Sequence, residues 1–139
     1  MRTVSVERII NAPLEKVWEV AGKFGESPGS SIEITVEKDG DPNSNGLGME
    51  RTIHFLKLKV KVYERLESFD PPNSFSYSVL SGAPVKSYLG KAEFSAIGDA
   101  TKVKWSGTFT PKIPGLGWLI GIMSIKNINN FLDELENIK

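Results

Sequence analysis

Two hydrophobic periods follow one another along the chain, and their order constrains the fold more than any other feature. Between residues 32 and 110, apolar side chains recur mainly at every second position, most clearly over 57–62, where Lys alternates with Leu or Val. This period of two predicts half-buried strands of an antiparallel sheet. After Pro114 the apolar residues take helical spacing, which predicts a long amphipathic helix over about residues 116–137.

The beginning of the chain predicts one more strand and a short helix. Residues 2–10 alternate as a strand does, and Pro13 suits the first turn of a helix over 13–24. A helix with one apolar stripe and a sheet with one apolar face can bury both if the sheet curves around the helix. We therefore expect a single α+β domain over residues 1–139, with the sheet wrapped around the C-terminal helix.

Composition excludes several classes of protein. The sequence has no Cys and one His, so disulfides, thiol nucleophiles and clusters of Cys or His ligands are excluded, and we expect no metal and no cofactor. The 17 basic and 17 acidic residues balance, which argues against binding of nucleic acid. The chain has neither a signal peptide nor a run of 18 apolar residues, so we expect a cytoplasmic protein without stable membrane insertion, as a monomer or weak homodimer.

Polar and aromatic side chains fall on the same strand faces as the apolar residues. By strand parity these are Arg51, Glu64, Tyr77, Tyr88 and Trp105. Because burial of an isolated charge is costly, Arg51 and Glu64 must pair, reach water or meet a ligand. His54 falls on the opposite, solvated face, which argues against a triad or a His base.

Several segments together resemble the START/Bet v 1-like superfamily, closest to its polyketide cyclase/dehydrase and lipid-transport branch. They are Val6–Trp18, Gly48–Arg51, Val62–Asp70, Phe75–Tyr77, Thr101–Trp105 and Phe109–Pro111. The resemblance implies the helix-grip fold, in which a seven-stranded antiparallel sheet surrounds the C-terminal helix and two short helices follow strand 1. It also implies a hydrophobic cavity, but no single chemistry.

Each candidate residue has both a functional and a structural interpretation. Arg51 and Glu64 could anchor the polar end of a ligand or form a structural ion pair. Tyr77 and Tyr88 could bind a ligand carbonyl or only pack, and Trp18 is expected to fix the short helix to the sheet. The side chains expected to line the ligand site are Arg51, Ile53, Phe55, Val62, Glu64, Tyr77, Val79, Tyr88, Trp105, Trp118, Ile122, Met123, Ile125 and Asn129.

Three functions follow as hypotheses. The first is binding of a small hydrophobic molecule (a lipid, polyketide or aromatic compound) in a cavity between the sheet and the C-terminal helix. The second is a polyketide cyclase or dehydratase, with Arg51, Glu64, Tyr77 and Tyr88 as candidate catalytic residues. The third is a protein-interaction module of the chaperone-activator type, which would need an exposed apolar patch.

Overall fold

The computed structural model describes residues 2–23, 32–40, 47–56 and 59–137 of the chain. The elements in chain order are β1 (Arg2–Ile10), α1 (Leu14–Ala21), β2 (Ile32–Lys38), β3 (Glu50–Phe55), β4 (Val60–Asp70), β5 (Ser74–Ser81), β6 (Val85–Ile97), β7 (Ala100–Pro111) and α2 (Gly117–Glu136). The strand predicted over 2–10 and the long helix predicted over 116–137 are confirmed, the helix to within one residue at each end.

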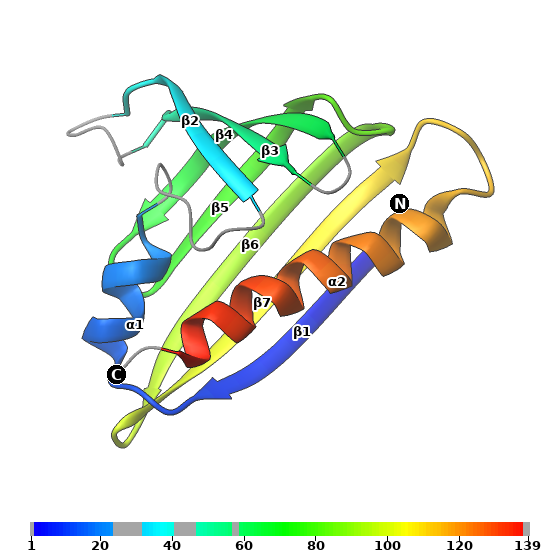
Figure 1. The fold of residues 1–139 in the computed structure, drawn as a ribbon. Coiled ribbons are helices and arrows are strands. Elements are labelled where there is room, and N and C mark those ends of the chain that lie inside the picture. The colour runs from blue at the N-terminus through cyan, green and yellow to red at the C-terminus, as the bar shows by residue number, and fades with distance from the viewer. Residues whose placement is uncertain (1, 24–31, 41–46, 57–58, 138–139) are drawn as a thin grey trace.

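The seven strands form one antiparallel sheet in the order β1-β7-β6-β5-β4-β3-β2. The sheet curves strongly, and α2 runs along its concave side (Figure 1). The α+β helix-grip prediction is therefore confirmed. One short helix, α1, follows β1 and is shorter than the predicted 13–24. A second short helix would have to fall within residues 24–31, which lie outside the described residues.

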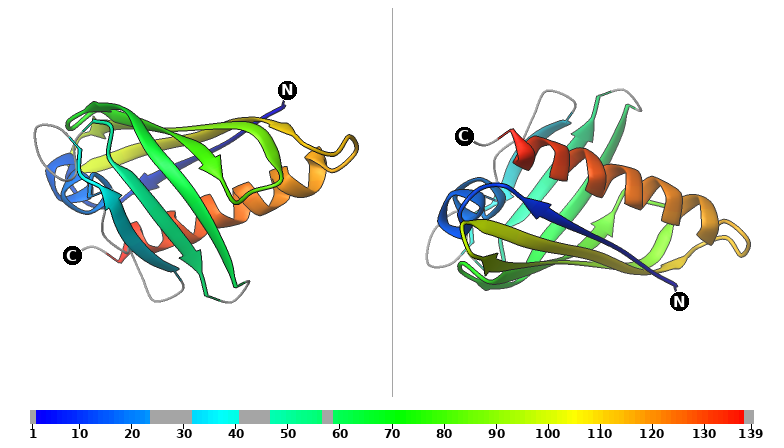
Figure 2. Two further views of the ribbon diagram at one scale, coloured as in Figure 1. Left: turned by 90° about the horizontal axis from the view of Figure 1, so that it is seen from above. Right: turned by 90° about the horizontal axis from the view of Figure 1, so that it is seen from below.

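Helix α2 packs mainly on the β1–β7 side of the sheet, and α1 lies beside its C-terminal end (Figure 2). Three small residues of α2, Gly117, Gly121 and Ser124, are buried in this contact. A Cβ added at Gly121 would come within 3.4 Å of Val4 on β1, so the small side chain allows the helix to approach the sheet closely. Strands β2, β3 and β4 arch over the other side of the concavity (Figures 1 and 2).

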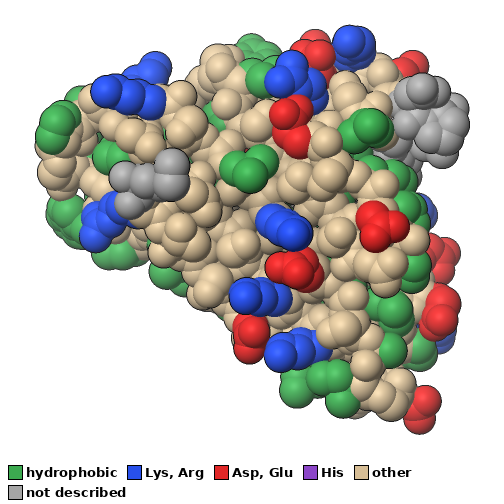
Figure 3. Space-filling model, turned by 180° about the vertical axis from the view of Figure 1, so that it is seen from behind, with side chains coloured by type: hydrophobic (Ala, Val, Ile, Leu, Met, Phe, Trp, Pro, Cys, Tyr) green, Lys and Arg blue, Asp and Glu red, His purple; other side chains and the backbone are tan. Residues whose placement is uncertain are grey.

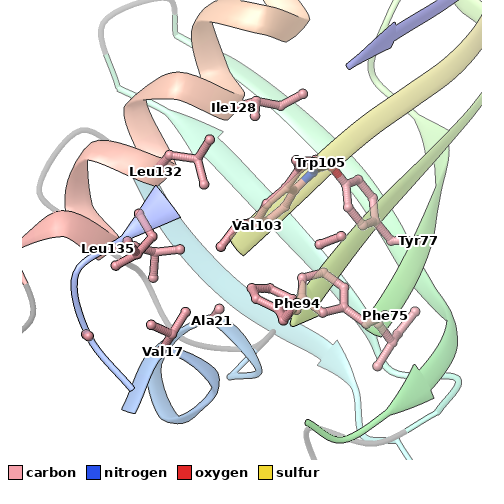
Figure 4. Close-up of a cluster of buried hydrophobic side chains, with 14 of the residues drawn as sticks. Val17, Ala21, Phe75, Tyr77, Phe94, Val103, Trp105, Ile128, Leu132 and Leu135 are labelled. Carbon is pink, nitrogen blue, oxygen red and sulfur yellow. Dashed lines mark hydrogen bonds between the residues drawn. The ribbon is translucent and has the colours of Figure 1, made fainter. Parts of the chain in front are cut away.

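The packed core lies toward the α1 end of the molecule. There, Leu132 and Leu135 of α2 meet Val17 of α1 and Val103 of β7 (Figure 4). Trp18 joins this core from α1. Its ring centroid lies 5.7 Å from that of Phe69, 6.1 Å from that of Phe75 and 5.4 Å from that of Phe94. The prediction that Trp18 fixes α1 to the sheet is confirmed.

The outer face of the sheet carries mixed charge. Lysines and arginines alternate there with acidic side chains rather than forming a field of one sign (Figure 3). His54 has the strand parity of this face and is half-buried, with Nδ1 4.0 Å from Oε2 of Glu33. Within the described ranges, no helix is long and apolar enough to cross a membrane.

Candidate functional site

The centre of the candidate site is a buried ion pair between strands β3 and β4. Arg51 and Glu64 are direct register partners, which places both side chains on the concave face. Nε of Arg51 donates to Oε1 of Glu64 at 3.0 Å, and Nη2 donates to the same oxygen at 2.8 Å. Glu64 retains only 6% of its surface. The predicted ion pair is confirmed, and its burial separates it from a surface salt bridge of little energetic weight.

Two aromatic residues extend this polar group across the sheet. Tyr77 on β5 lies beneath the guanidinium, with Cζ of Arg51 5.8 Å from the ring centroid, within reach of a cation–π interaction. The Tyr77 hydroxyl accepts a hydrogen bond of 3.0 Å from Nε1 of Trp105 on β7. Tyr77 and Trp105 are both buried. Arg51, Glu64, Tyr77 and Trp105, predicted separately from strand parity, thus form one connected cluster.

A second polar contact links the sheet to α2. The hydroxyls of Tyr88 on β6 and Ser124 on α2 share a hydrogen bond. The Tyr88 ring also stacks on Phe109, at a centroid distance of 5.7 Å. Ser124 was not predicted, yet it is the residue that ties α2 to the concave face at this point.

Two glycines leave the space that the rings of Tyr77 and Tyr88 occupy. A Cβ added at Gly90 would overlap the Tyr77 ring, and one added at Gly107 would overlap the Tyr88 ring. Each glycine is the inward residue of the adjacent strand, because Tyr77 pairs with Gly90 and Gly90 pairs with Gly107. The rings therefore lie flat across neighbouring strands, and both hydroxyls stay on the concave side.

Burial shifts the protonation equilibria of the cluster. It raises the pKa of Glu64 above its ordinary value, and the charge and hydrogen bonds of Arg51 act in the opposite direction. Burial also raises the pKa of Tyr77, with smaller contributions from Tyr88 and Glu64 in the same direction. For Tyr88, burial raises the pKa while the bond to Ser124 lowers it. Both phenols therefore stay neutral and can act as hydrogen-bond donors.

Four predicted apolar residues lie on the same face as the polar cluster. Ile53 pairs with Val62 across β3 and β4, and Val79 pairs with Glu64. Ile53 and Val62 are buried, whereas Val79 and Phe55 are half-buried. These side chains surround the ion pair with hydrocarbon.

Two of the α2 residues that were predicted to face the sheet, Ile122 and Met123, are exposed instead. Oδ1 of Asn129 accepts a bond of 2.9 Å from Nη2 of Arg8 on β1, so this side of α2 faces the edge strand. Ile122 and Ile125, at helical spacings of seven and four, share that side. Trp118 is 57% exposed, Ile122 56% and Met123 43%.

The face of α2 that meets the concavity is marked by Phe131 instead. Its ring lies 4.9 Å from that of Trp105, and Ser124, seven residues earlier, lies on the same face. The sequence holds one signal for this face: Gly117, Gly121, Ser124 and Ile128 recur at helical spacing. A search for apolar residues alone passes over it, since three of the four are small or polar.

Surface hollows lie away from the cluster. One of about 430 Å³ is lined by residues that include Glu7, Glu93, Lys102 and Lys104, and a second of about 380 Å³ lies beside Ile9 and Ile97. Neither is lined by a residue predicted for the ligand site. The internal cavity expected from the sequence remains a prediction. In the described part of the chain, His, Asp and Glu do not gather in groups of three or more that could hold a metal ion.

Comparison with known proteins gives the family. The family model for polyketide cyclase/dehydrase and lipid transport proteins matches residues 1–137. A comparison with curated proteins finds no match. An uncharacterised protein from Bacillus thuringiensis has a similar structure, with a TM-score of 0.79, 22% identity and coverage of 97% of this chain and 96% of that one.

Two further solved structures share the fold at lower identity. A START superfamily protein from Mycobacterium smegmatis matches with a TM-score of 0.79, 12% identity and coverage of 96% and 94%. Norcoclaurine synthase from Thalictrum flavum, solved with dopamine and hydroxybenzaldehyde, matches with a TM-score of 0.77, 13% identity and coverage of 97% and 84%. With the family model spanning almost the whole sequence, the chain belongs to the polyketide cyclase/dehydrase and lipid transport family.

Proposed function

We propose that this protein binds a small, largely apolar molecule with one polar end between the concave face of the sheet and α2. The observation that carries the proposal is the buried Arg51–Glu64 pair, which faces the concavity beside Tyr77 rather than the solvent. A buried ion pair adds little net stability compared with apolar side chains of similar volume. Its position is better explained by recognition of a ligand's polar group.

The apolar surroundings supply the rest of the affinity. Ile53, Val62 and Val79 lie around the pair, and Tyr88 with Phe109 extends the surface toward the first half of α2. Burial of a ligand against such walls contributes roughly 25 cal/mol per Å² of apolar surface, before the costs of association. The packed core at the α1 end closes the opposite side.

Nuclear magnetic resonance of the three tryptophan indole N–H groups tests the location. Titration with a neutral apolar probe, N-phenyl-1-naphthylamine, should saturate at one probe per chain and shift the Trp105 signal, because that N–H donates to Tyr77. The Trp18 signal, from a ring that packs against Phe69, Phe75 and Phe94 in the core, serves as the internal control and should stay in place. Binding without a Trp105 shift, or no saturable binding, would reject the proposal.

Native mass spectrometry of freshly purified protein gives an independent readout. We expect a stoichiometric co-purified small molecule, which organic extraction would then release for identification. Its absence together with the absence of probe binding would leave the buried pair as a structural feature only.

A second candidate is cyclisation or dehydration of a polyketide by general acid–base catalysis. It is favoured by one observation: burial raises the pKa of Glu64 above its ordinary value, as suits a proton-transferring carboxyl group. Incubation with aromatic polyketide intermediates and mass analysis of the products tests it. Catalysis requires a change in mass or structure that is lost in Glu64→Gln, whereas unchanged recovery of bound intermediates excludes it.

A further inference from the structure

One oxygen of the Glu64 carboxylate is unused. Two bonds from Arg51 end on Oε1, and among the described residues no donor reaches Oε2. A carboxylate can accept about four hydrogen bonds, so Oε2 of Glu64 has unused acceptor capacity, although it is not among the buried atoms that lack a partner. This acceptor capacity lies on the concave face, because Glu64 shares that face with its partners Arg51 and Val79.

The charge around Oε2 is close to balanced. Arg51 provides one positive charge, and it is directed at Oε1 of Glu64. Tyr77 and Tyr88, the other titratable groups coupled to Glu64, have raised pKa values and are neutral phenols. Apolar side chains of Val62, Val79 and Ile53 complete the surroundings.

We propose that the polar end of the ligand is an uncharged hydroxyl group that donates a hydrogen bond to Oε2 of Glu64. The ligand class is therefore an apolar alcohol or phenol, rather than a fatty acid or another carboxylate. This inference rests on the proposed function and names the chemistry that the same site selects.

Competing polar ends fit this arrangement less well. A carboxylate would place a second negative charge beside Glu64, while the positive charge of Arg51 is already compensated. An ether or ketone has no proton to give and would leave Oε2 unpaired beneath the ligand. A hydroxyl donates to Oε2 without bringing a net charge into a buried site.

Three naphthalene probes of similar size separate these cases in the full-length protein. They are 2-naphthol, which carries a hydroxyl, 2-methoxynaphthalene, which has no donor, and 2-naphthoate, which is an anion. Because a hydrogen bond to a charged group contributes more than one between neutral groups, 2-naphthol should bind at least about tenfold more tightly than the other two. Fluorescence titration or calorimetry gives the three dissociation constants.

Glu64→Gln replaces the hydrogen-bond acceptor at the position of Oε2 with a donor. Arg51 still requires an acceptor, so the amide oxygen should face Arg51 and the amide N–H₂ should occupy the position of Oε2. The preference for 2-naphthol should fall at least about fivefold, and 2-naphthoate should gain affinity because position 64 no longer carries a negative charge that repels it. Circular dichroism confirms that the variant is folded.

Glu67→Gln is the matched control. Glu67 lies on the same strand and forms a similar pair, with Oε1 2.6 Å from Nε of Arg65, but both side chains are substantially exposed. This variant should keep the preference of the wild type. If all three probes bind equally, or if Glu64→Gln leaves the preference unchanged, the hydroxyl inference is overturned while ligand binding stands. If no probe binds, both proposals fail.

Discussion

Arg51 donates two hydrogen bonds to a single oxygen of Glu64, at 3.0 and 2.8 Å, in a pair that is buried on the concave face of the sheet. A side-by-side arrangement would instead satisfy both carboxylate oxygens. The geometry therefore fixes the guanidinium while leaving one side of the carboxylate open to the interior.

Removal of Arg51 alone should be strongly destabilising. In Arg51→Met the Glu64 carboxylate stays buried without its counter-charge, and we expect a loss of about 3–5 kcal/mol in the free energy of unfolding. The double variant Arg51→Met/Glu64→Leu should recover most of this loss, because hydrocarbon replaces both charges. Urea unfolding followed by circular dichroism measures both values. A double variant no more stable than the single one would contradict this account of the pair.

The stability contributed by Glu64 should depend on pH with a defined sign. Its pKa in the folded protein is raised above the ordinary 4.5, so the folded state binds the proton more tightly than the unfolded state does. The contribution is therefore fully present below the unfolded pKa and is lost as the pH rises through the folded pKa. Arg51, Tyr77 and Tyr88 face Glu64 from β3, β5 and β6. Burial raises the pKa of both tyrosines, so these phenols stay neutral in this window.

Comparison with Glu64→Gln isolates this effect, because the amide does not titrate. Unfolding free energies measured from about pH 4 to about pH 8 should show wild type losing stability relative to the variant as the pH rises. A difference that stays flat, or that changes in the opposite direction, would show that Arg51 outweighs burial.

Sequence patterning could predict the sheet and its polar cluster for a simple reason. A period of two fixes which residues share a face, so Arg51, Glu64, Tyr77 and Trp105 could be assigned to one side before their partners were known. The assignment of Ile122 and Met123 to the sheet-facing side of α2 was wrong, because the buried residues of this helix include Gly117, Gly121 and Ser124. Hydrophobic periodicity cannot detect small residues that bring two backbones close together.

The partners and geometry of individual hydrogen bonds could not be predicted from the sequence either. Parity places Tyr88 on the concave face, but it cannot show that the hydroxyl meets Ser124 rather than Glu64. Likewise, Arg51 bonds one oxygen of Glu64 because of side-chain torsion angles, and the hydrophobic pattern of the sequence does not encode these angles.

The bond between Tyr88 and Ser124 should couple α2 to the sheet energetically. A double-mutant cycle with Tyr88→Phe and Ser124→Ala is expected to give a coupling energy of about 1 kcal/mol, the usual net contribution of one hydrogen bond. The cycle cancels the gain in helix propensity that Ala brings at position 124. Additive effects of the two substitutions would show that the bond contributes nothing in solution.

Gly90 should be intolerant of even one methyl group. The Tyr77 ring lies directly over it, and a Cβ there would overlap the ring. In Gly90→Ala the ring must move away from Arg51 and Trp105, which should cost about 1–3 kcal/mol of stability. The Trp105 indole N–H signal should shift as its bond to Tyr77 weakens.

A variant with a smaller residue at position 77 supplies the control for this substitution. In a Tyr77→Leu background the six-membered ring is gone, so the further change Gly90→Ala should cost less than about 1 kcal/mol, because Ala suits an ordinary strand backbone at least as well as Gly. Urea unfolding of all four variants gives the two costs. If Gly90→Ala were equally destabilising in both backgrounds, the cost would come from the strand itself, and the fit of the Tyr77 ring over Gly90 would have no energetic role.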